Sequence, residues 1–569
     1  MIKIKNPNLT AVFQYLILFV SAIYNFSLFS GTKLYGNAAS RVLLALGPML
    51  GIGSPYKDLY ELVPPGYLML VVGWVRAFGM SMDAFRLLQV FVVLINGWLL
   101  IKVLEKLFDI KLLRLFIFFT TIVTVHSWVI QTDFFSIDFF ATTLVLGGLA
   151  SLLHLKNKFL KVSLAATLFV LASQMKDIYA LSVLSLAPYY LRELFAKDKK
   201  DLLRLLVQSA LGPLMVLGSI AAYLQLNDSL AAYLNIIDDK TGFAQTQTFS
   251  LRLTYHSFKT MVAIVEENFS LAPQPLLGLF IINSIVFFAL FKKQIQKTLQ
   301  QVFKTIYSTD SDWRSLFRQF IKFLDGQLKN YGETSWGRIL LTITVIVFVL
   351  FGLTIYGLYF GTQLIMIVTS YYLVVGILMI IPLRQLAEAK SWPLKVFLSL
   401  ALLTIFVPKH IPRFFNFVPM HRDYTFAIEE DIIAKVGKDE CILHVHGWEI
   451  AISYIYTQRR PCSKYFLSNE LFNIKRPGVV EEYSQHLVDN PPAAFLYNEK
   501  GSDMDIEKFD NQIIDFNQVL DSCYQPDPKY TDYMKHFFAQ MTLYWPREGL
   551  TPEELQKCWA EVVFSDKTL

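Results

Sequence analysis

GSPYKDLYELVPPGY, residues 53–67, is a polar stretch between two strongly apolar segments of a mostly apolar chain. It places three charged residues, Lys57, Asp58 and Glu61, ahead of the proline pair 64–65. Proline suits the first turn of a helix, because the N–H that it lacks would have no partner there. We therefore predict that a helix begins at the proline pair and that the acidic groups lie at its entrance.

The composition around this stretch is typical of a polytopic membrane protein. Of the 569 residues, 54% are hydrophobic and 17% are charged, and the mean hydropathy is +0.42, whereas soluble domains are about one quarter charged. A membrane span needs about 20 apolar residues. We predict about 11 spans, near 9–30, 84–101, 112–130, 134–154, 159–175, 178–193, 203–225, 274–291, 338–360, 363–383 and 393–408.

The basic residues decide the orientation of these spans. Segment 66–80 is ambiguous because it is short and contains Arg76, but placing it in the outer interface makes every basic loop cytoplasmic. The predicted transmembrane domain is then 1–409, with outer loops 31–83 and 226–273 and an inner amphipathic segment 292–338. The first span is too long for a signal peptide and is expected to be retained. No clustered basic face suggests nucleic acid as a partner.

After residue 409 the charge rises and short apolar runs such as ECILHVHG and PPAAFLYN alternate with helical patterns such as TPEELQKCWAEVVF. Segment 410–569 is therefore predicted to be a small extracytoplasmic α/β domain. All four cysteines lie there, which favours at least one disulfide in an oxidising compartment over four buried thiols. Zinc is disfavoured because no C-x-x-C pair is present. The residues concerned are Cys441, Cys462, Cys523 and Cys558.

The predicted outer face collects carboxylates and cations from several loops. Carboxylates can act as bases or hold a divalent metal, and Lys and Arg bind phosphate. Charged residues are costly at membrane depth, so those that flank the spans on one face are functional candidates by default. This set fits a phosphorylated lipid carrier docked at the outer leaflet of the bilayer.

The order of motifs resembles that of the GT-C superfamily of membrane glycosyltransferases, in particular the family 39 and aminoarabinose-transferase-like members. A first span precedes an outer loop ending in PY-x-D-x(5)-PPG-Y (55–67), then come FG (78–79), FRL (85–87), an acidic second outer turn, a lysine at the sixth span (Lys176) and a terminal domain with a PP strand (491–492). The resemblance implies a GT-C fold and sugar transfer from a polyprenyl-phosphate carrier to an extracytoplasmic lipid, glycan or protein. Inversion is expected, with a carboxylate as general base.

One position departs from the family pattern. Asn37 stands where the family usually carries the acidic residue that serves as base, and an amide cannot accept a proton at neutral pH. Either the base has moved to Asp58 or Glu61, or the stretch matches in another register, or the chain is not an ordinary member.

Site roles follow as expectations. The candidate bases are Asp58, Asp138, Glu61 and Asp133. The candidate donor-phosphate ligands are Lys57, Arg41, Arg86, Lys176 and Arg252. Tyr56, Tyr60 and His256 are expected to contact substrate, and a divalent ion (Mg or Mn) would fit at Asp138 and Asp58. The expected location is a bacterial inner or plasma membrane, with the active site and the C-terminal domain facing the periplasm or exterior.

Simpler interpretations remain open. Asp58 and Glu61 could be solvated loop residues or charges at a helix end, Asp133 could cap its span, and Arg86 could only extend to the interface. A non-catalytic lipid or polysaccharide transporter would need charged residues along the spans. A structural membrane subunit with a partner-binding outer domain is the third alternative.

Overall fold

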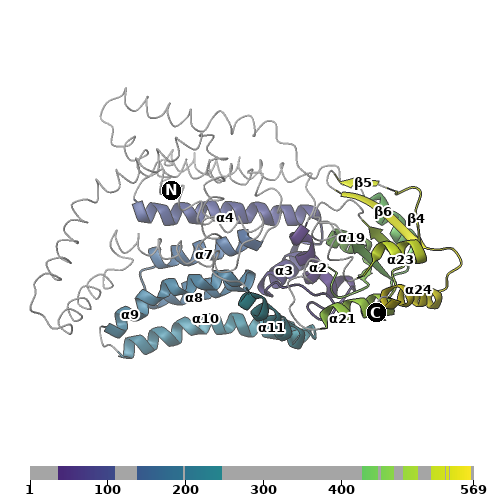
Figure 1. The fold of residues 1–569 in the computed structure, drawn as a ribbon. Coiled ribbons are helices and arrows are strands. Elements are labelled where there is room, and N and C mark those ends of the chain that lie inside the picture. Colours follow the sequence, from purple (N-terminus) through teal and green to yellow (C-terminus); the bar gives the residue numbers. More distant parts are fainter. Residues whose placement is uncertain are drawn as a thin grey trace, which may run out of the picture.

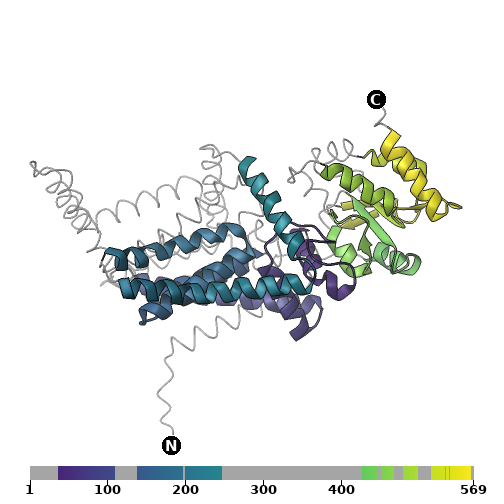
Figure 2. The same ribbon diagram turned by 90° about the horizontal axis from the view of Figure 1, so that it is seen from below.

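The structure is a computed structural model that describes residues 36–108, 137–195, 199–246, 426–445, 450–466, 478–497, 514–531, 533–536 and 539–565. A bundle of long helices occupies one end of the described part, and a domain built on a β-sheet occupies the other (Figures 1 and 2). Several predictions fall outside the described residues. They are the spans near 9–30, 112–130, 274–291, 338–360, 363–383 and 393–408, the inner segment 292–338 and the domain boundary at 409.

Four of the predicted spans appear as α-helices of the bundle: α4 (Met82–Phe108), α7 (Ile137–His154), α8 (Lys158–Met175) and α10 (Lys199–Leu226). Within the described part, Met82–Leu99, Lys158–Met175 and Lys200–Leu226 are long and apolar enough to cross a membrane. Asn157 fixes the start of α8, because its side chain accepts hydrogen bonds from the N–H groups of Phe159 and Leu160 at 2.9 and 3.1 Å. The exposed leucines of α10 give this helix an apolar face suited to lipid.

The span predicted at 178–193 is not one α-helix. The chain forms a 3₁₀-helix, η1 (Asp177–Leu186), followed by the short α9 (Ala187–Phe195). Ser182 and Ser185 donate hydrogen bonds to the carbonyls of Tyr179 and Ser182, three residues back, at 2.6 and 2.5 Å. Because a 3₁₀-helix is tighter than an α-helix and is formed only in short pieces, this segment differs from the regular span that its apolar residues predict.

All the ionisable residues of α4, α7, α8 and α10 lie within two turns of a helix end. At the end remote from the sheet domain, Lys158 pairs with Glu193 at 3.2 Å and with Asp201 at 2.7 Å. His154 Nε2 lies 2.9 Å from the carbonyl oxygen of Lys102 at the same end (Figure 1). The basic residues at these described helix ends and the sheet domain therefore lie at opposite ends of the bundle, the relative arrangement that the charge pattern predicts.

The stretch 53–67 connects α2 (Gly36–Leu50) to α3 (Gly66–Phe78), and α3 begins directly after the proline pair, as predicted. With 13 residues α3 is about 20 Å long, too short for a hydrocarbon core of about 30 Å. A Cβ on Gly66 would lie 2.6 Å from the carbonyl oxygen of Gln174, so only glycine fits where α3 crosses the end of α8. This close approach fixes the first outer loop to the bundle.

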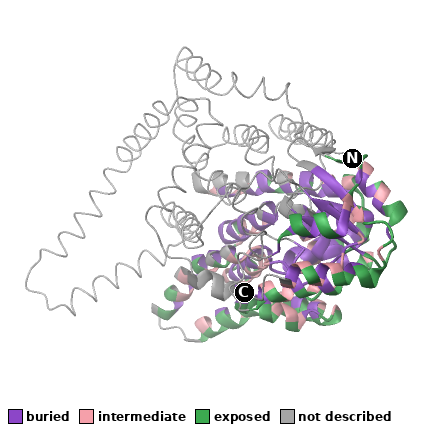
Figure 3. Cartoon of the chain, turned by 45° about the vertical axis from the view of Figure 1, so that its right-hand side comes forward, coloured by how far each residue is buried: buried purple, intermediate pink, exposed green. Residues whose placement is uncertain are grey.

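The C-terminal domain contains a mixed sheet with strand order β2-β1-β3-β6-β4, and β5 also pairs with β6. The strands are β1 (Cys441–Val445), β2 (Arg460–Pro461), β3 (Ala494–Tyr497), β4 (Tyr524–Pro526), β5 (Tyr533–His536) and β6 (Ala539–Pro546). β1 is parallel to β2 and β3, and β6 is antiparallel to β3, β4 and β5. The two predicted strand runs became β1 and β3, which are buried along their whole length (Figure 3).

Helices pack on this sheet as an α/β domain: α18 (Ala427–Lys435), α19 (Ile450–Thr457), α21 (Val479–Asp489), α23 (Phe516–Cys523) and α24 (Pro552–Ser565). Thr551 and Glu554 start α24 with reciprocal side-chain to backbone bonds of 3.3 and 2.8 Å, a capping box. The fully buried Trp559 of α24 packs with Phe495, and its indole N–H donates to the hydroxyl of Tyr524 at 2.9 Å.

Two disulfides confirm the prediction from the cysteines. Cys441 pairs with Cys462, and Cys523 pairs with Cys558, so the described chain holds no free thiol. The first joins β1 to the residue after β2, and the second joins α23 to α24. Such cross-links stabilise a domain by limiting the freedom of the unfolded chain.

Candidate functional site

The first outer loop is held between the bundle and the C-terminal domain, and Tyr60 makes the connection. Its backbone N–H donates to the carbonyl oxygen of Lys464 at 2.8 Å, and its hydroxyl donates to Asp239 of α11 (Leu230–Thr246) at 2.9 Å. Its ring lies 5.1 Å from that of Tyr465. One buried residue thus joins three parts of the chain that are far apart in sequence.

Tyr56 is the second buried tyrosine of this loop. It adopts a left-handed backbone conformation with φ 66°, and its hydroxyl donates to the carbonyl oxygen of Val63 at 2.8 Å. Its ring packs 5.0 Å from Tyr233 of α11, and burial is the first cause that raises the pKa of its phenol. Tyr56 and Tyr60 therefore shape the loop from within. Their predicted contact with substrate stays a prediction, although neither ring presents an open face in this structure.

Arg41 and Glu61, predicted for different roles, form an ion pair with each other. Arg41 Nε of α2 lies 3.3 Å from Glu61 Oε1, and the side chains are only 13% and 4% exposed. The alternative of a solvated loop carboxylate is therefore wrong for Glu61. The predicted contact of Arg41 with a donor phosphate stays a prediction.

Lys57 and Asp58 are exposed on the same loop. Lys57 pairs with Asp228, in the turn between α10 and α11, and the hydrogen bond from Lys57 is the first cause that lowers the pKa of Asp228. Asp58 Oδ2 accepts a 2.7 Å hydrogen bond from the backbone N–H of Ser54. The two candidate carboxylates of the loop thus differ in setting, one buried and ion-paired and the other open.

Arg86 and Lys176, two more candidate phosphate ligands, flank α3. Arg86 lies in the first turns of α4, 2.5 Å from Asp83, with 12% of its side chain exposed. Lys176 separates α8 from η1, two residues beyond the Gln174 that contacts Gly66. Both candidates therefore belong to the end of the bundle that carries the first outer loop.

A polar cavity of about 690 Å³ opens between this loop and the C-terminal domain. Lys57 and Asp58 line one wall, and Arg460, Lys464 and His486 belong to the opposite wall. Burial, and then the cation of Lys464, hold the pKa of His486 below its usual value, although Glu482 and Asp489 act in the opposite direction. The open carboxylate of the loop therefore faces a largely cationic surface.

The remaining candidates are placed less fully. Asp133, Arg252 and His256 lie outside the described residues, and of Asp138 and Asn37 only the helices are described, the first turns of α7 and α2. Among the described side chains, no group of three His, Cys, Asp or Glu residues is arranged to hold a metal ion. The divalent ion at Asp138 and Asp58 therefore stays a prediction.

Sequence analysis did not identify the wall of the cavity that the C-terminal domain forms. Its residues showed no motif, and their approach to the loop depends on contacts between positions about 60 and about 464. Asp239 was visible as one of several acidic residues in the fourth outer loop, but nothing singled it out as the partner of Tyr60. A feature that could have pointed to the wall is the run SKY (463–465) directly after a disulfide cysteine.

Known proteins resemble this chain in structure alone. No protein-family model and no curated protein sequence matches it. The crystal structure of ArnT from Cupriavidus metallidurans bound to undecaprenyl phosphate superposes with a TM-score of 0.52 at 12% identity, covering 93% of this chain and 97% of that one. The apo structure of the same ArnT gives 0.47 at 13% identity, covering 94% and 98%. Over nearly its whole length, this chain therefore has the fold of the solved ArnT structure.

Proposed function

We propose that the chain is a membrane glycosyltransferase that moves a sugar from a polyprenyl-phosphate carrier to an extracytoplasmic acceptor. The observation that carries the proposal is the outer loop of an ArnT-like fold, in which Arg41, Lys57, Asp58 and Glu61 gather at one end of the helix bundle. The solved ArnT holds undecaprenyl phosphate, a carrier of the proposed class. Cations for a phosphate and carboxylates for a proton are what this transfer needs.

The reaction would proceed in one displacement. An acceptor hydroxyl attacks the anomeric carbon, its proton passes to a carboxylate, and the bond from the anomeric carbon to the phosphate oxygen breaks. The electron pair leaves with the polyprenyl phosphate, whose charge the nearby cations would stabilise, and the anomeric centre is inverted. We favour Asp58 as the base among the described candidates, because its carboxylate is exposed whereas that of Glu61 is buried against Arg41.

The transporter alternative is less well supported. A transport path would require ionisable groups inside the spans, but those of α4, α7, α8 and α10 stay within two turns of the helix ends. The groups of the first outer loop instead gather at one surface, as an interfacial enzyme requires.

The test uses the purified full chain in detergent or nanodiscs. We expect undecaprenyl phosphate to bind, as read by native mass spectrometry, and a panel of undecaprenyl-phosphate sugars to include one that supports transfer. Asp58→Asn should lower the transfer rate by about 10²–10⁴, the usual contribution of a general base. The matched control is Asp521→Asn, which changes an exposed aspartate of α23.

Two outcomes would count against the proposal. If no polyprenyl-phosphate sugar is consumed and undecaprenyl phosphate does not bind, the transferase function is wrong. If transfer occurs but the amide variants of Asp58, Glu61, Asp133 and Asp138 all keep near-normal turnover, the base lies elsewhere.

A further inference from the structure

The side chains that line the cavity between the first outer loop and the C-terminal domain carry a net positive charge. Its lining includes four cationic side chains and two carboxylates, a formal excess of two positive charges with histidine neutral. The cations are Lys57, Lys438, Arg460 and Lys464, and the carboxylates are Asp58 and Asp439. Such an excess in a concave site favours an anionic ligand.

Two of the four cations form ion pairs within the described part of the chain, and the other two do not. Lys57 pairs with Asp228, and Lys464 pairs with Glu482. Within the described part of the chain, Lys438 and Arg460 have no carboxylate at ion-pair distance; the guanidinium of Arg460 has only a 3.4 Å contact with the amide oxygen of Asn490. Lys438 and Arg460 are therefore the groups that remain to bind an added anion.

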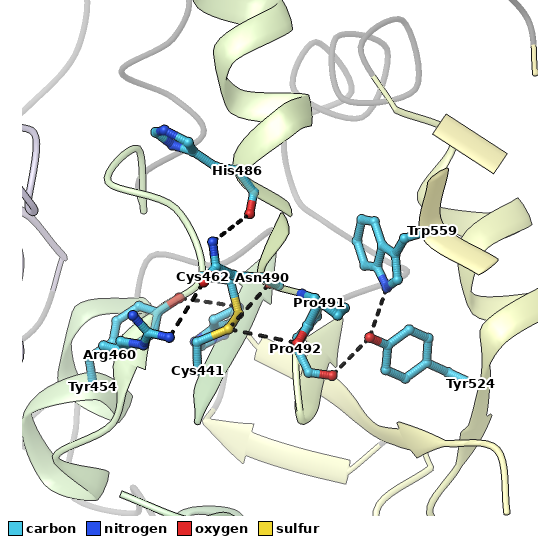
Figure 4. Close-up of a disulfide and its surroundings, with 11 residues drawn as sticks. Cys441, Tyr454, Arg460, Cys462, His486, Asn490, Pro491, Pro492, Tyr524 and Trp559 are labelled. Atoms are coloured by element: carbon cyan, nitrogen blue, oxygen red, sulfur yellow. Dashed lines mark hydrogen bonds between the residues drawn. A yellow bond between two sulfur atoms is a disulfide. The ribbon is translucent and has the colours of Figure 1, made fainter. Parts of the chain in front are cut away.

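Contacts within the protein hold in place the wall of the cavity that carries Arg460. β2 pairs in parallel with β1, and the disulfide between Cys441 and Cys462 cross-links the same two segments. The Asn490 amide donates to the carbonyl oxygen of His486 at 3.2 Å at the end of α21. Figure 4 shows Arg460 and His486 on one side of this disulfide and Tyr524 and Trp559 of the domain core on the other. A preformed wall lowers the entropy cost of binding.

The other polar residues that line the cavity can form hydrogen bonds with the hydroxyl groups of a ligand. Ser463 Oγ lies 3.2 Å from His486 Nδ1, and both residues line the cavity with Asn490 and Asp58, so hydrogen-bond donors and acceptors surround the cations. A volume of about 690 Å³ is within the range of small-molecule sites. A group that combines one negative charge with several hydroxyls matches this lining better than a bare ion or an apolar chain.

We propose that this cavity binds an acidic sugar, one that carries a phosphate or carboxylate, and that the charged group sits between Lys438 and Arg460. If the proposed transferase function holds, this sugar belongs to the acceptor, because Asp58, the favoured base, lines the same cavity. The first outer loop would then supply the base, and the C-terminal domain would select an acceptor by its charge.

The binding test needs no donor. The probe is glucose 6-phosphate, compared with glucose and with inorganic phosphate, and its binding to the purified full chain is followed by saturation-transfer NMR, or by ³¹P line broadening for phosphate. We expect glucose 6-phosphate to bind more tightly than either fragment. Lys438→Gln and Arg460→Gln should each weaken binding by roughly tenfold, the loss expected for a charge-assisted hydrogen bond. Lys557→Gln, which removes an exposed cation of α24, should leave binding unchanged.

The outcomes separate the parts of the inference. Equal binding by wild type and both pocket variants would overturn the site, and equal binding of phosphate and glucose 6-phosphate would overturn the sugar. In transfer assays with acidic acceptors, the pocket variants should raise the KM for the acceptor and leave undecaprenyl phosphate binding unchanged. If the pocket variants instead raise the KM for the donor, the cavity binds the donor and not the acceptor. If the wild type transfers no sugar, the proposed function fails while the binding test still decides the cavity.

Discussion

Replacing Glu61 by glutamine should destabilise the folded protein, because the charge of Arg41 then stays in a buried site without the carboxylate of Glu61. The two side chains are 4% and 13% exposed, with Nε and Oε1 3.3 Å apart. At an effective dielectric constant of about 20, unit charges at that separation attract by about 5 kcal/mol. Most of this attraction offsets the desolvation of the pair, but removing one partner of a buried pair typically costs 3–5 kcal/mol. The glutamine oxygen can still accept a hydrogen bond from Nε, so we expect a loss of about 2–3 kcal/mol.

A double-mutant cycle measures this loss. Thermal or denaturant unfolding of the full chain in detergent, followed by tryptophan fluorescence, is compared for wild type, Glu61→Gln, Arg41→Gln and the double variant. Each single variant should be clearly less stable, and the double variant should recover at least 1 kcal/mol relative to the sum of the singles, as coupled neighbours do. Asp58→Asn is the matched control, because its exposed side chain keeps an oxygen for the Ser54 N–H.

The result that refutes the reasoning is additivity. If Glu61→Gln is as stable as wild type, or if the effects of the two single variants simply add, the two charges do not depend on each other. The cycle also bears on activity, since a drop in transfer by Glu61→Gln signals loss of a base only at a temperature where that variant remains folded.

Three further predictions concern the C-terminal domain and the topology. Replacing Cys441 and Cys462 together by serine should lower the stability of the domain by about 3 kcal/mol for a closed loop of this size; unchanged unfolding after the replacement would contradict it. Burial lowers the pKa of His486 in the folded state below its unfolded value of about 6.5, so the unfolded chain binds more protons. The contribution of His486 to stability should therefore be full above about pH 6.5 and fall as the pH drops below it. His486→Gln should flatten that part of a plot of unfolding free energy against pH, and an unchanged slope would count against the prediction. A cysteine at position 557 should react with an impermeant maleimide on intact cells and a cysteine at position 156 should not, since the two lie at opposite ends of the described structure; labelling of both from the same side would overturn the orientation.

Features that depend on local sequence could be predicted. The apolar runs near 84–101, 134–154, 159–175 and 203–225 gave helices, and the proline pair marked the start of α3, because hydrophobic length and proline chemistry act within one segment. The run 178–193 was misread because hydropathy does not distinguish an α-helix from a 3₁₀-helix. The existence of disulfides could be predicted because all four cysteines fall in one domain that is predicted to lie outside, whereas their pairing required the fold.

Pairing between distant residues could not be predicted. Arg41 and Glu61 were both identified as candidates, but for separate roles, since nothing in a sequence shows that a cation and a carboxylate 20 positions apart meet in a buried site. The cavity depends on contacts between the first outer loop and residues more than 370 positions later, so its Arg460 and Lys438 carried no signal. The tyrosines of the loop were expected at a sugar, and their burial against Tyr233 and Tyr465 reflects packing that only the assembled fold reveals.

The hydrogen bond from Tyr60 to Lys464 uses main-chain atoms at both ends. Substitution at position 464 therefore changes the side chain at the cavity wall without removing the bond that docks the domain. The same holds for other wall positions whose side chains take no part in docking. Under the proposed role of the cavity, attachment and recognition are separable, so single replacements could alter the charge preference of the C-terminal domain while the domain stays docked on the helix bundle. Laboratory libraries restricted to wall positions such as 438, 460 and 464 should likewise yield folded variants with new acceptor preferences.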